Sequence, residues 1–538
     1  MSFFGRKPII ALLQRRVIDL KEGYRQNLAL FGPRFIGKTA ILEEFISQLN
    51  DEKLTCVYLA LEEGDFAHFV NQFIVRILSG FLRSKKITSD DNLTLLLEQA
   101  QRFLPATVIQ ARNVLQNLEK DRPADAYREL LNLPDTFEDE AGGFCLIVLD
   151  EFQEMEDFGI ANVFQELGKK VMVQRKSIYI LASSLRAKAQ KILTEKLSLL
   201  FGNFEIVEVK PFSIETSLEF IEESLKGYAL EKSCRNFLVD FTAGHPFYLE
   251  IICTQLLRAA MASGQQTVFL NNLIDGLEEL LFERWGVLNL HFSRTIESLG
   301  PKKSRGIFWN LLYIVACGNN KLAQILDKAG KERGRTALRL NRLVEEELLL
   351  KNGNVFCISD KLFGFWLKTA SQKMVKGFLN GPVEERLYFK NELKQKLAAF
   401  IQTSNNEVEV RIIELLKSFD NELFQLNGRR HRLPGFSRVY PLNFNGNAAQ
   451  NLKGLIAETQ RDKWALLFKE GMILDVDILS FLSATSEKDE KFARRVVISL
   501  SEMETNARLR ALQEKMWIWS AADMNFILSL FGKSYIVK

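Results

Sequence analysis

The chain has 538 residues, with 71 basic and 67 acidic side chains and a net charge of +4. Its composition, 47% hydrophobic and 26% charged with only 11 prolines, argues against a disordered protein, and the charge balance gives no whole-chain reason to expect nucleic acid. Three or four domains are expected, because one domain usually holds roughly 100–200 residues.

The six cysteines are widely spaced and form no CxxC pair, which argues against a zinc site and fits a reducing compartment. No stretch approaches ~20 apolar residues without a charge, and the N-terminus contains no long apolar run. We therefore expect a cytoplasmic protein that does not use a membrane.

Residues 1–210 alternate strand and helix patterns, which predicts an α/β fold with a parallel sheet covered on both faces. A mostly helical insert, about residues 85–140, separates the second and third strands. The short apolar runs expected to be strands are 27–32, 55–61, 144–150, 177–184 and 204–209.

Four further segments are expected after this core. Residues 211–300 have a helical pattern and predict a helical lid. Residues 301–370 contain three helical runs and a hairpin turning at Asn352-Gly353, which indicates a winged helix. A helical connector over 371–404 then leads to a second α/β pattern over 405–538, in which a helix is expected between the strands 437–442 and 463–470.

The first strand runs into a phosphate-binding sequence that fits GxxxxGK[ST]. Glycines let backbone N–H groups curl around phosphates, Lys38 reaches the β and γ oxygens, the Thr39 hydroxyl ligates Mg²⁺, and the helix start favours an anion. A chance loop is disfavoured because a strand precedes the motif and a helix follows it. The expected nucleotide contacts in this loop are Gly32, Pro33, Arg34, Phe35, Ile36, Gly37, Lys38, Thr39 and Ala40.

The third strand ends in a pair of carboxylates, Asp150-Glu151. Carboxylates at the tip of a central strand lie where open α/β sheets bind ligands. Asp150 is expected to hold Mg²⁺ through water, and Glu151 to activate the attacking water. A solvated acidic loop is the alternative. At the end of the fourth strand, Ser183 or Ser184 could contact the γ-phosphate or the water, although a simple turn is equally expected.

Five motifs in order resemble the archaeal-type ATPase family of the STAND branch of AAA+-related P-loop NTPases. The resemblance covers about 370 N-terminal residues. The matching motifs are Phe3-Phe4-Gly5-Arg6, Gly32 to Thr39, Asp150-Glu151-Phe152-Gln153, Gly244-His245-Pro246-Phe247, and Asp360-Lys361-Leu362-Phe363-Gly364-Phe365-Trp366.

The resemblance implies bound ATP and Mg²⁺, with Arg6 near the nucleotide and with His245 and Pro246 on a lid that senses it. From the residues alone, a capping or core histidine at a helix start is the favoured interpretation of His245. Two positions depart from the family pattern: Phe35 replaces a second arginine, and Asn203 follows Phe201-Gly202 where an arginine is usual. If that arginine contributes to catalysis, hydrolysis is expected to be slow.

The third helical run of the predicted winged helix is basic. Its cations would suit contacts to DNA phosphates, whereas a solvated basic face or a purely conformational switch are the alternatives. Glu345, Glu346 and Glu347 follow it and offset part of the charge. The cations of this run are Lys331, Arg333, Arg335, Arg339 and Arg342.

The C-terminal pattern loosely resembles the restriction-endonuclease-like domain that is often fused to such ATPases. The resemblance implies Asp on one strand and Glu-x-Lys on the next, which together bind Mg²⁺. Aligning the lysine on Lys469 puts Leu467 at the glutamate position, and the strand "SRVYPLN" supplies no Asp. We therefore expect a non-cleaving domain. Arg429, Arg430, His431 and Arg432 are expected on a hairpin loop that could face nucleic acid or a protein.

These patterns predict an ATP-hydrolysing switch that couples ATP or ADP binding to a nucleic-acid or protein partner. Glu151, Lys38 and Ser184 are the expected catalytic residues, and Thr39 and Asp150 the expected metal ligands. The alternatives are an ATP-dependent nuclease or defence effector, and a nucleotide-binding adaptor that does not hydrolyse. An oligomer is compatible with the sequence.

Overall fold

The computed structural model describes residues 3–61, 65–87, 92–197, 202–264, 266–330, 333–353, 355–371, 382–426, 429–444, 452–486 and 492–537. These residues form two compact units. The first unit contains the chain up to Phe212 and two short segments, His245–Phe247 and Glu345–Glu347, and the second unit contains the rest.

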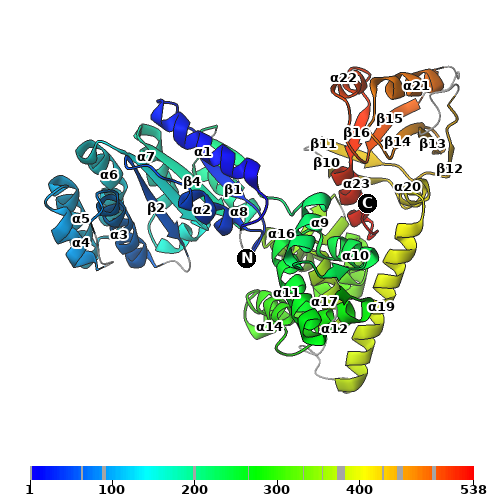
Figure 1. Cartoon of the computed structure of the whole chain (residues 1–538), viewed down its shortest axis with the longest axis horizontal. Helices are drawn as coiled ribbons and strands as arrows, with labels where there is room; N and C mark the ends of the chain where they lie inside the picture. The colour runs from blue at the N-terminus through cyan, green and yellow to red at the C-terminus, as the bar shows by residue number, and fades with distance from the viewer. Residues whose placement is uncertain are drawn as a thin grey trace. The chain divides into compact units, whose positions relative to one another are not determined.

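A five-stranded sheet of parallel strands lies at the centre of the first unit, which confirms the predicted α/β fold (Figure 1). Because β4 lies between β1 and β3, the residues that follow these three strands meet at one edge of the sheet. The strands in spatial order are β2 (Leu54–Ala60), β3 (Phe144–Asp150), β4 (Ser177–Ser183), β1 (Asn27–Phe31) and β5 (Phe204–Glu208).

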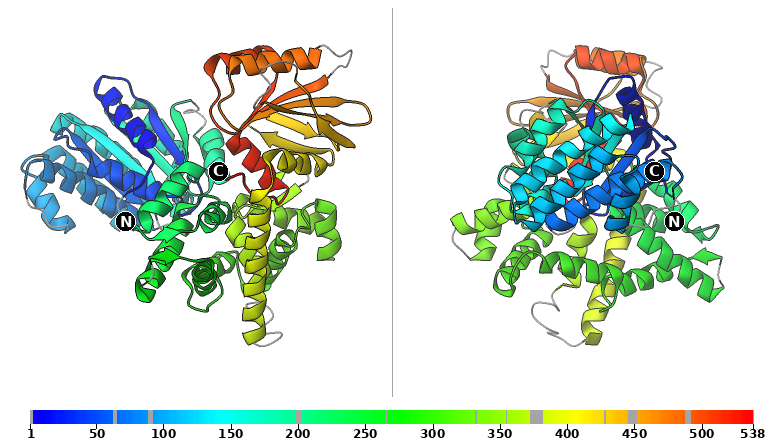
Figure 2. Two further views of the ribbon diagram at one scale, coloured as in Figure 1. Left: turned by 45° about the vertical axis from the view of Figure 1, so that its right-hand side comes forward. Right: turned by 90° about the vertical axis from the view of Figure 1, so that its left-hand side faces the viewer.

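Helices cover both faces of this sheet (Figure 2). One face packs against α1 (Lys7–Lys21) and α2 (Lys38–Ser47). The insert between β2 and β3 is helical, as expected, and packs on the other face together with the helices that follow β3 and β4. These helices are α3 (Phe66–Ser84), α4 (Leu93–Ala100), α5 (Pro105–Glu119), α6 (Pro123–Ala141), η1 (Phe152–Phe158), α7 (Val163–Val173), α8 (Arg186–Lys191) and η2 (Ile192–Lys196).

The central strands read as continuous apolar runs because both of their faces are buried. In β1, Leu28 and Leu30 pack with α1 and α2, whereas Ala29 and Phe31 pack with α3 and its neighbours. All four side chains are buried. Such strands lose the alternation of polar and apolar residues that marks a half-exposed sheet.

The second unit begins with helices, which match the helical pattern after residue 211. Two very short strands, β6 (Ala229–Leu230) and β7 (Thr267–Val268), pair between them. The helices are α9 (Ile214–Ser224), α10 (Lys232–Thr242), α11 (Pro246–Ser263), whose first two residues group with the first unit, α12 (Leu270–Leu281) and α13 (Val287–Glu297).

Three helices and an antiparallel hairpin follow in the order expected for residues 301–370. They are α14 (Lys302–Ala316), α15 (Leu322–Ala329), α16 (Arg333–Glu345), β8 (Leu349–Asn352) and β9 (Val355–Ile358). The next helix, α17 (Lys361–Thr369), begins at Asp360, whose carboxylate accepts the backbone N–H groups of Leu362 and Phe363. The Asp360 to Trp366 motif is thus a helix start. A long helix, α19 (Pro382–Asn405), follows and packs against α10, α12 and α17.

The C-terminal part contains α20 (Val408–Lys417), a hairpin of β10 (Glu422–Leu426) and β11 (Arg429–Leu433), and a five-stranded mixed sheet. The first three strands of this sheet are antiparallel and the last three parallel. Its elements in chain order are β12 (Arg438–Pro441), β13 (Lys453–Glu458), β14 (Lys463–Lys469), α21 (Asp475–Ser486), β15 (Phe492–Ser499), α22 (Thr505–Gln513), β16 (Trp517–Ser520) and α23 (Ala521–Leu530).

Two expectations for this part are wrong. The helix expected between residues 442 and 463 is not formed over Lys453–Glu458, which is strand β13. Arg429–Leu433 forms a strand rather than a loop, because it pairs along its whole length with Glu422–Leu426. None of the helices in the described part of the chain has the length and apolarity needed to cross a membrane.

Candidate nucleotide site

The phosphate-binding sequence forms a tight turn between β1 and α2. The backbone N–H of Gly32 donates to the Ser183 carbonyl at 3.3 Å, and a Cβ at Gly32 would lie 2.5 Å from the Val209 carbonyl oxygen. Gly37 has φ 96° and precedes Lys38, the first residue of α2. Phe35 also has a left-handed backbone, with φ 59°, although it carries a side chain. The turn therefore depends on backbone conformations that favour glycine.

Lys38 is a buried cation inside this turn. Its Nζ donates to the carbonyls of Gly32 at 2.9 Å and Pro33 at 3.1 Å, and lies 3.8 Å from Oε1 of Glu151. Burial lowers the pKa of Lys38, and Glu151 and Asp150 oppose that shift. The ammonium is held at the centre of the turn, where phosphate oxygens would be able to replace the carbonyls.

Asp150 and Thr39 are brought together at the carboxyl edge of the sheet. The Thr39 hydroxyl donates to Oδ2 of Asp150 at 2.7 Å, and the Tyr58 hydroxyl reaches the same oxygen at 3.3 Å. Burial raises the pKa of Asp150, while the Thr39 hydrogen bond lowers it. Tyr58 was not expected from the sequence, because its role follows from the pairing of Ala60 with Asp150 across β2 and β3.

Glu151 is fixed by residues from two neighbouring elements. Its Oε2 accepts hydrogen bonds from the backbone N–H and the hydroxyl of Ser184, both at 2.8 Å, and from Nε2 of Gln153 at 2.8 Å. Of the two candidate serines, Ser184 therefore contacts Glu151, whereas the Ser183 hydroxyl accepts from the Leu185 N–H. Glu151 has φ 55°, a strained conformation that turns its carboxylate back toward the phosphate turn.

The residues present fit Mg²⁺ and a nucleotide. The described residues contain no cluster of three or more His, Cys, Asp or Glu side chains suited to a metal. Mg²⁺ is usually held by one or two protein ligands together with substrate phosphates and water. The hydroxyl of Thr39 and the carboxylate of Asp150 would therefore suffice as the protein ligands.

Arg6 lies in the first unit with an unsatisfied buried donor. Its guanidinium stands over the Phe212 ring at 4.8 Å, and its buried Nη2 atom has no hydrogen-bond partner among the residues that the structure describes. Burial lowers the pKa of Arg6 to about 10. A half-buried cation with a spare buried donor is an environment in which a ligand can supply the missing acceptor, and the position of Arg6 near the nucleotide stays an expectation.

The expected lid residues His245 and Pro246 belong to the short segment that groups with the first unit. Nε2 of His245 lies 3.2 Å from the Arg34 carbonyl oxygen, and Pro246 is the first residue of α11. The Phe35 and Phe247 rings stack at 4.8 Å. Of the remaining expected contacts, Ile36 is buried, whereas Pro33, Arg34 and Ala40 are exposed.

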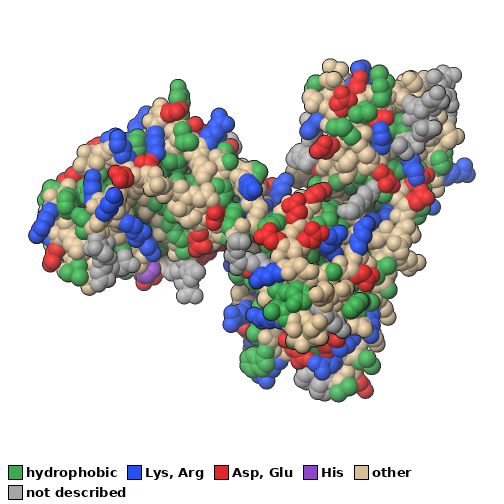
Figure 3. All heavy atoms as spheres, viewed as in Figure 1, with side chains coloured by type: hydrophobic (Ala, Val, Ile, Leu, Met, Phe, Trp, Pro, Cys, Tyr) green, Lys and Arg blue, Asp and Glu red, His purple; other side chains and the backbone are tan. Residues whose placement is uncertain are grey.

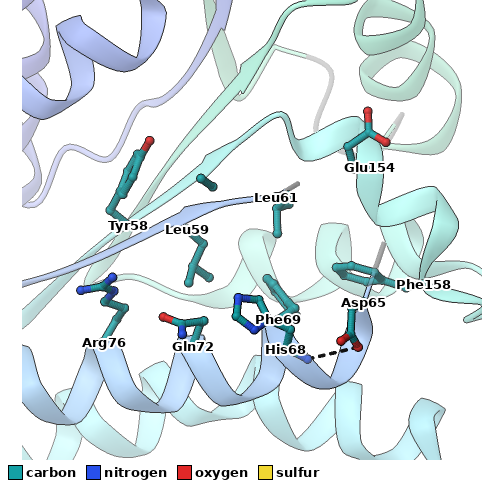
Figure 4. A pocket seen from close by; sticks show the side chains of 11 residues that line it. Tyr58, Leu59, Leu61, Asp65, His68, Phe69, Gln72, Arg76, Glu154 and Phe158 are labelled. Carbon is teal, nitrogen blue, oxygen red and sulfur yellow. Dashed lines mark hydrogen bonds between the residues drawn. The ribbon is translucent and has the colours of Figure 1, made fainter. Parts of the chain in front are cut away.

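A separate cavity of about 320 Å³ opens beside the end of β2. Figure 4 shows His68, Gln72 and Arg76 of α3 pointing toward β2, while the Tyr58 side chain points away from them. The Tyr58 side chain thus points toward Asp150, with which its hydroxyl forms a hydrogen bond, and away from these α3 side chains.

The cations expected at a nucleic-acid interface lie in the second unit. Arg333, Arg335 and Arg342 of α16 are exposed and Arg339 is half-buried, whereas Lys331 lies outside the described residues. Arg342 also stands over the Phe308 ring at 5.1 Å. On β11, Arg430 and Arg432 are exposed.

The expected nuclease position holds no pair of carboxylates. The strand opposite β14 is β13, and its Gly454 lies directly across from Leu467. A Cβ at Gly454 would come within 2.8 Å of the Phe444 ring. Lys469 instead pairs with the buried Asp477, 2.8 Å away. Apolar groups thus fill the place where a carboxylate pair would be needed.

No family model matches this chain, and no curated protein is similar to it in sequence. Solved structures that resemble it include a Walker-type ATPase of Pyrococcus abyssi, with 17% identity and a TM-score of 0.48 over 68% of this chain and 96% of that one. The ORC2 protein of Aeropyrum pernix, in ADPNP–ADP complexes, has 12% identity and a TM-score of 0.43 over 73% and 97% of the two chains.

The Holliday junction branch migration motor RuvB of Thermotoga maritima shows 12% identity and a TM-score of 0.33, over 67% of this chain and 94% of that one. At these identities and scores the likeness is distant. The function proposed below therefore rests on the residues of this chain.

Proposed function

We propose that the chain binds ATP with Mg²⁺, hydrolyses it, and uses the nucleotide state to control binding to a nucleic-acid or protein partner. The observation that carries this proposal is the convergence of Lys38, the Thr39–Asp150 pair and the Glu151–Ser184 contact at one edge of the parallel sheet.

The residues divide the chemistry between them. Backbone N–H groups of the turn and the Lys38 ammonium would bind the β and γ phosphates. Mg²⁺, when bound at Thr39 and Asp150, would offset phosphate charge. Glu151, held by Ser184 and Gln153, would orient the attacking water and accept its proton. The spare donor of Arg6 supports the same site, because a bound nucleotide would give it an acceptor.

The switch part of the proposal is supported by how the chain is divided. His245–Phe247 and Glu345–Glu347 group with the first unit, although the residues on both sides of each segment belong to the second. Within the first unit, Glu347 accepts the Arg186 backbone N–H at 2.5 Å, just after the β4 tip. The chain thus passes from one unit to the other at each of these two segments. Contacts of these segments that differ between the ATP-bound and ADP-bound states would shift the conformational equilibrium of the second unit.

The partner is proposed to meet the second unit through α16, which would act as the helix of a winged helix. Basic and acidic side chains are interspersed over the face seen in Figure 3, so local clusters matter more than net charge. The turn of the hairpin after α16 packs against strand β10. Asn352 Oδ1 accepts the Gln425 N–H at 2.8 Å, and a Cβ at Gly353 would lie 2.5 Å from the Leu423 carbonyl oxygen. A DNA contact made by this winged-helix segment would therefore depend on α16 itself.

We propose that the C-terminal sheet does not cut DNA. The facing residues Gly454 and Leu467 cannot hold a metal ion, and Lys469 is neutralised by Asp477. The nuclease alternative would require a carboxylate pair that these strands do not supply.

ATP turnover with and without DNA or RNA tests the first part of the proposal. Mg²⁺-dependent hydrolysis by the wild type, abolished by Glu151→Gln and retained by Glu154→Gln in the neighbouring η1 helix, supports a hydrolysing switch. Rates at background in the wild type under every condition, with ATP still bound, would instead support the adaptor.

The partner is tested with the double variant Arg335→Glu, Arg339→Glu. If α16 contacts phosphates, affinity for duplex DNA in low salt falls at least about tenfold, and the salt dependence of binding weakens. Arg102→Glu with Arg112→Glu, on the first unit, is the matched control. Unchanged affinity in the α16 variant would exclude α16 as the DNA contact and leave either Arg430 and Arg432 of β11 or a protein partner as the alternatives.

A further inference from the structure

One buried carboxylate in the second unit is surrounded by three cations. Asp240 of α10 is 4% exposed, and its Oδ1 lies 2.7 Å from Nζ of Lys361 and accepts the Tyr535 backbone N–H at 2.8 Å. Lys396 and Arg411 also lie within its electrostatic reach. A single carboxylate cannot balance three positive charges, and two of the four groups, Asp240 and Arg411, are buried from water.

Asp240, Lys396 and Arg411 border a cavity of about 260 Å³, while Lys361 contacts Asp240 from outside its lining. Two more ionisable groups lie in its wall, Lys533 and Glu414, whose charged atoms are 3.9 Å apart. Four cations therefore stand against two carboxylates, which leaves an excess of two positive charges. The lining residues are Asp240, Lys396, Ala399, Phe400, Thr403, Arg411, Glu414, Leu528, Gly532, Lys533 and Ser534.

Arg411 brings unused donors to this cavity. It is 5% exposed, and its Nη2 donates to the carbonyls of Ser534 at 2.7 Å and Tyr535 at 3.0 Å. Within the described part of the chain, its Nε and Nη1 atoms have no hydrogen-bond partner. Burial lowers the pKa of Arg411, and the nearby carboxylates of Asp240 and Glu414 oppose that shift.

The second cation, Lys396, reaches the cavity from α19. Its ammonium lies 6.0 Å from the centre of the buried Phe241 ring. The hydroxyls of Thr403 and Ser534 lie on the same lining. An ammonium, a guanidinium and hydroxyl groups around one cavity are the groups that bind phosphate oxygens in proteins.

We propose that this cavity binds a small anion bearing a phosphoryl group, with Arg411 and Lys396 as its cationic contacts. A phosphoryl dianion would balance the excess of two positive charges. The cavity has room for an organic group beyond the phosphate, against the apolar walls of Phe400 and Leu528. The site is separate from the phosphate turn, and its walls come from α10, α19, α20 and the segment after α23, so a bound anion would hold these elements together.

Isothermal titration of the full chain tests the proposal. The protein carries Lys38→Ala, which weakens phosphate binding at the turn, and inorganic phosphate, pyrophosphate and AMP are titrated at constant ionic strength. We expect saturable binding that Lys396→Ala weakens at least about tenfold, as loss of one charge-assisted contact predicts, and that Lys396→Arg restores. Tighter binding of AMP than of inorganic phosphate identifies a phosphorylated organic ligand, and the reverse identifies free phosphate.

Lys394→Ala provides the control, because both lysines are exposed on the same helix but only Lys396 lines the cavity. The affinity of the Lys394→Ala variant is expected to stay within about twofold of the parent, since an exposed charge outside the lining contributes little. Circular dichroism and the unfolding midpoint of each variant separate binding from folding. Absence of binding by all three probes, or equal binding in Lys396→Ala and Lys394→Ala, would overturn the proposal.

Discussion

The orientation of one carboxylate separates a site that hydrolyses ATP from one that only holds it. Glu151 has a left-handed backbone, and its Oε2 accepts three hydrogen bonds, two of them from Ser184. A charged side chain held this way loses little freedom when a water molecule must be aligned. Ser184 is therefore a positioning residue in the proposed mechanism.

Ser184→Ala is expected to slow ATP turnover without abolishing it. The variant loses the hydroxyl contact to Glu151 but keeps the backbone N–H contact. One hydrogen bond to a charged group is worth about 1.5–3 kcal/mol, so kcat should fall about 10- to 100-fold with little change in KM. Steady-state kinetics measure both constants. Ser183→Ala is the control, since that hydroxyl contacts Leu185, and an equal loss there would contradict the assignment.

Tyr58→Phe is expected to move the acidic limb of the pH–rate profile. Burial already raises the pKa of Asp150, and the Tyr58 hydroxyl counteracts that rise by hydrogen bonding to the ionised form. Without the hydroxyl the pKa of Asp150 rises further, so the carboxylate is lost at a higher pH as the solution is acidified. The Mg²⁺ concentration that gives the half-maximal rate is measured at several pH values. As the pH is lowered, this concentration should begin to rise at a higher pH in the variant than in the wild type. Superimposable profiles would exclude this role for Tyr58.

At the scale of helices and strands, α6 buries a carboxyl group against the far end of the sheet. Glu138 is 3% exposed and accepts a hydrogen bond from the Ser177 hydroxyl at the start of β4. Burial raises the pKa of Glu138 from 4.5 to about 7. Because the folded pKa exceeds the unfolded one, stability declines as pH rises from 4.5 to 7 and stays lower above that range.

Glu138→Gln should remove this decline. The amide keeps the shape of the protonated acid, so at pH 8 the variant is expected to be more stable than the wild type by up to about 3 kcal/mol, with the two similar at pH 4.5. Urea unfolding of the first unit at both pH values measures the difference. Glu119→Gln, an exposed position at the end of α5, controls for charge. A gain that is the same at both pH values would show that another effect operates.

The success of the sequence predictions also varied by element. The buried strands of the first sheet could be predicted because a short, continuous apolar run between helical patterns fits few structures other than a buried strand. The phosphate turn could be predicted because its backbone conformations favour glycine at fixed positions. Strand β13 was missed, because KGLIAE is short and contains a glycine that packs under Phe444. The role of Tyr58 could not be predicted, since it depends on which strands are neighbours.

At the scale of the whole molecule, the two units offer independent reporters of stability. A ligand that binds one folded unit raises the unfolding temperature of that unit by mass action. ATP with Mg²⁺ is therefore expected to raise the transition of the first unit. The Asp240 cluster lies in the second unit, where Lys361 of α17 and the Tyr535 backbone meet one carboxylate.

Asp240→Asn should lower only the transition of the second unit. The substitution removes the carboxylate that pairs with Lys361 and also attracts Lys396 and Arg411, and breaking a buried ion pair typically costs about 3–5 kcal/mol. Differential scanning calorimetry, with and without ATP and Mg²⁺, assigns each transition. Asp275→Asn is the matched control, because that carboxylate is 66% exposed and its pairing with Lys390 contributes little. Equal displacement of both transitions by Asp240→Asn would mean that the units unfold together, and the cluster would then stabilise the chain as a whole.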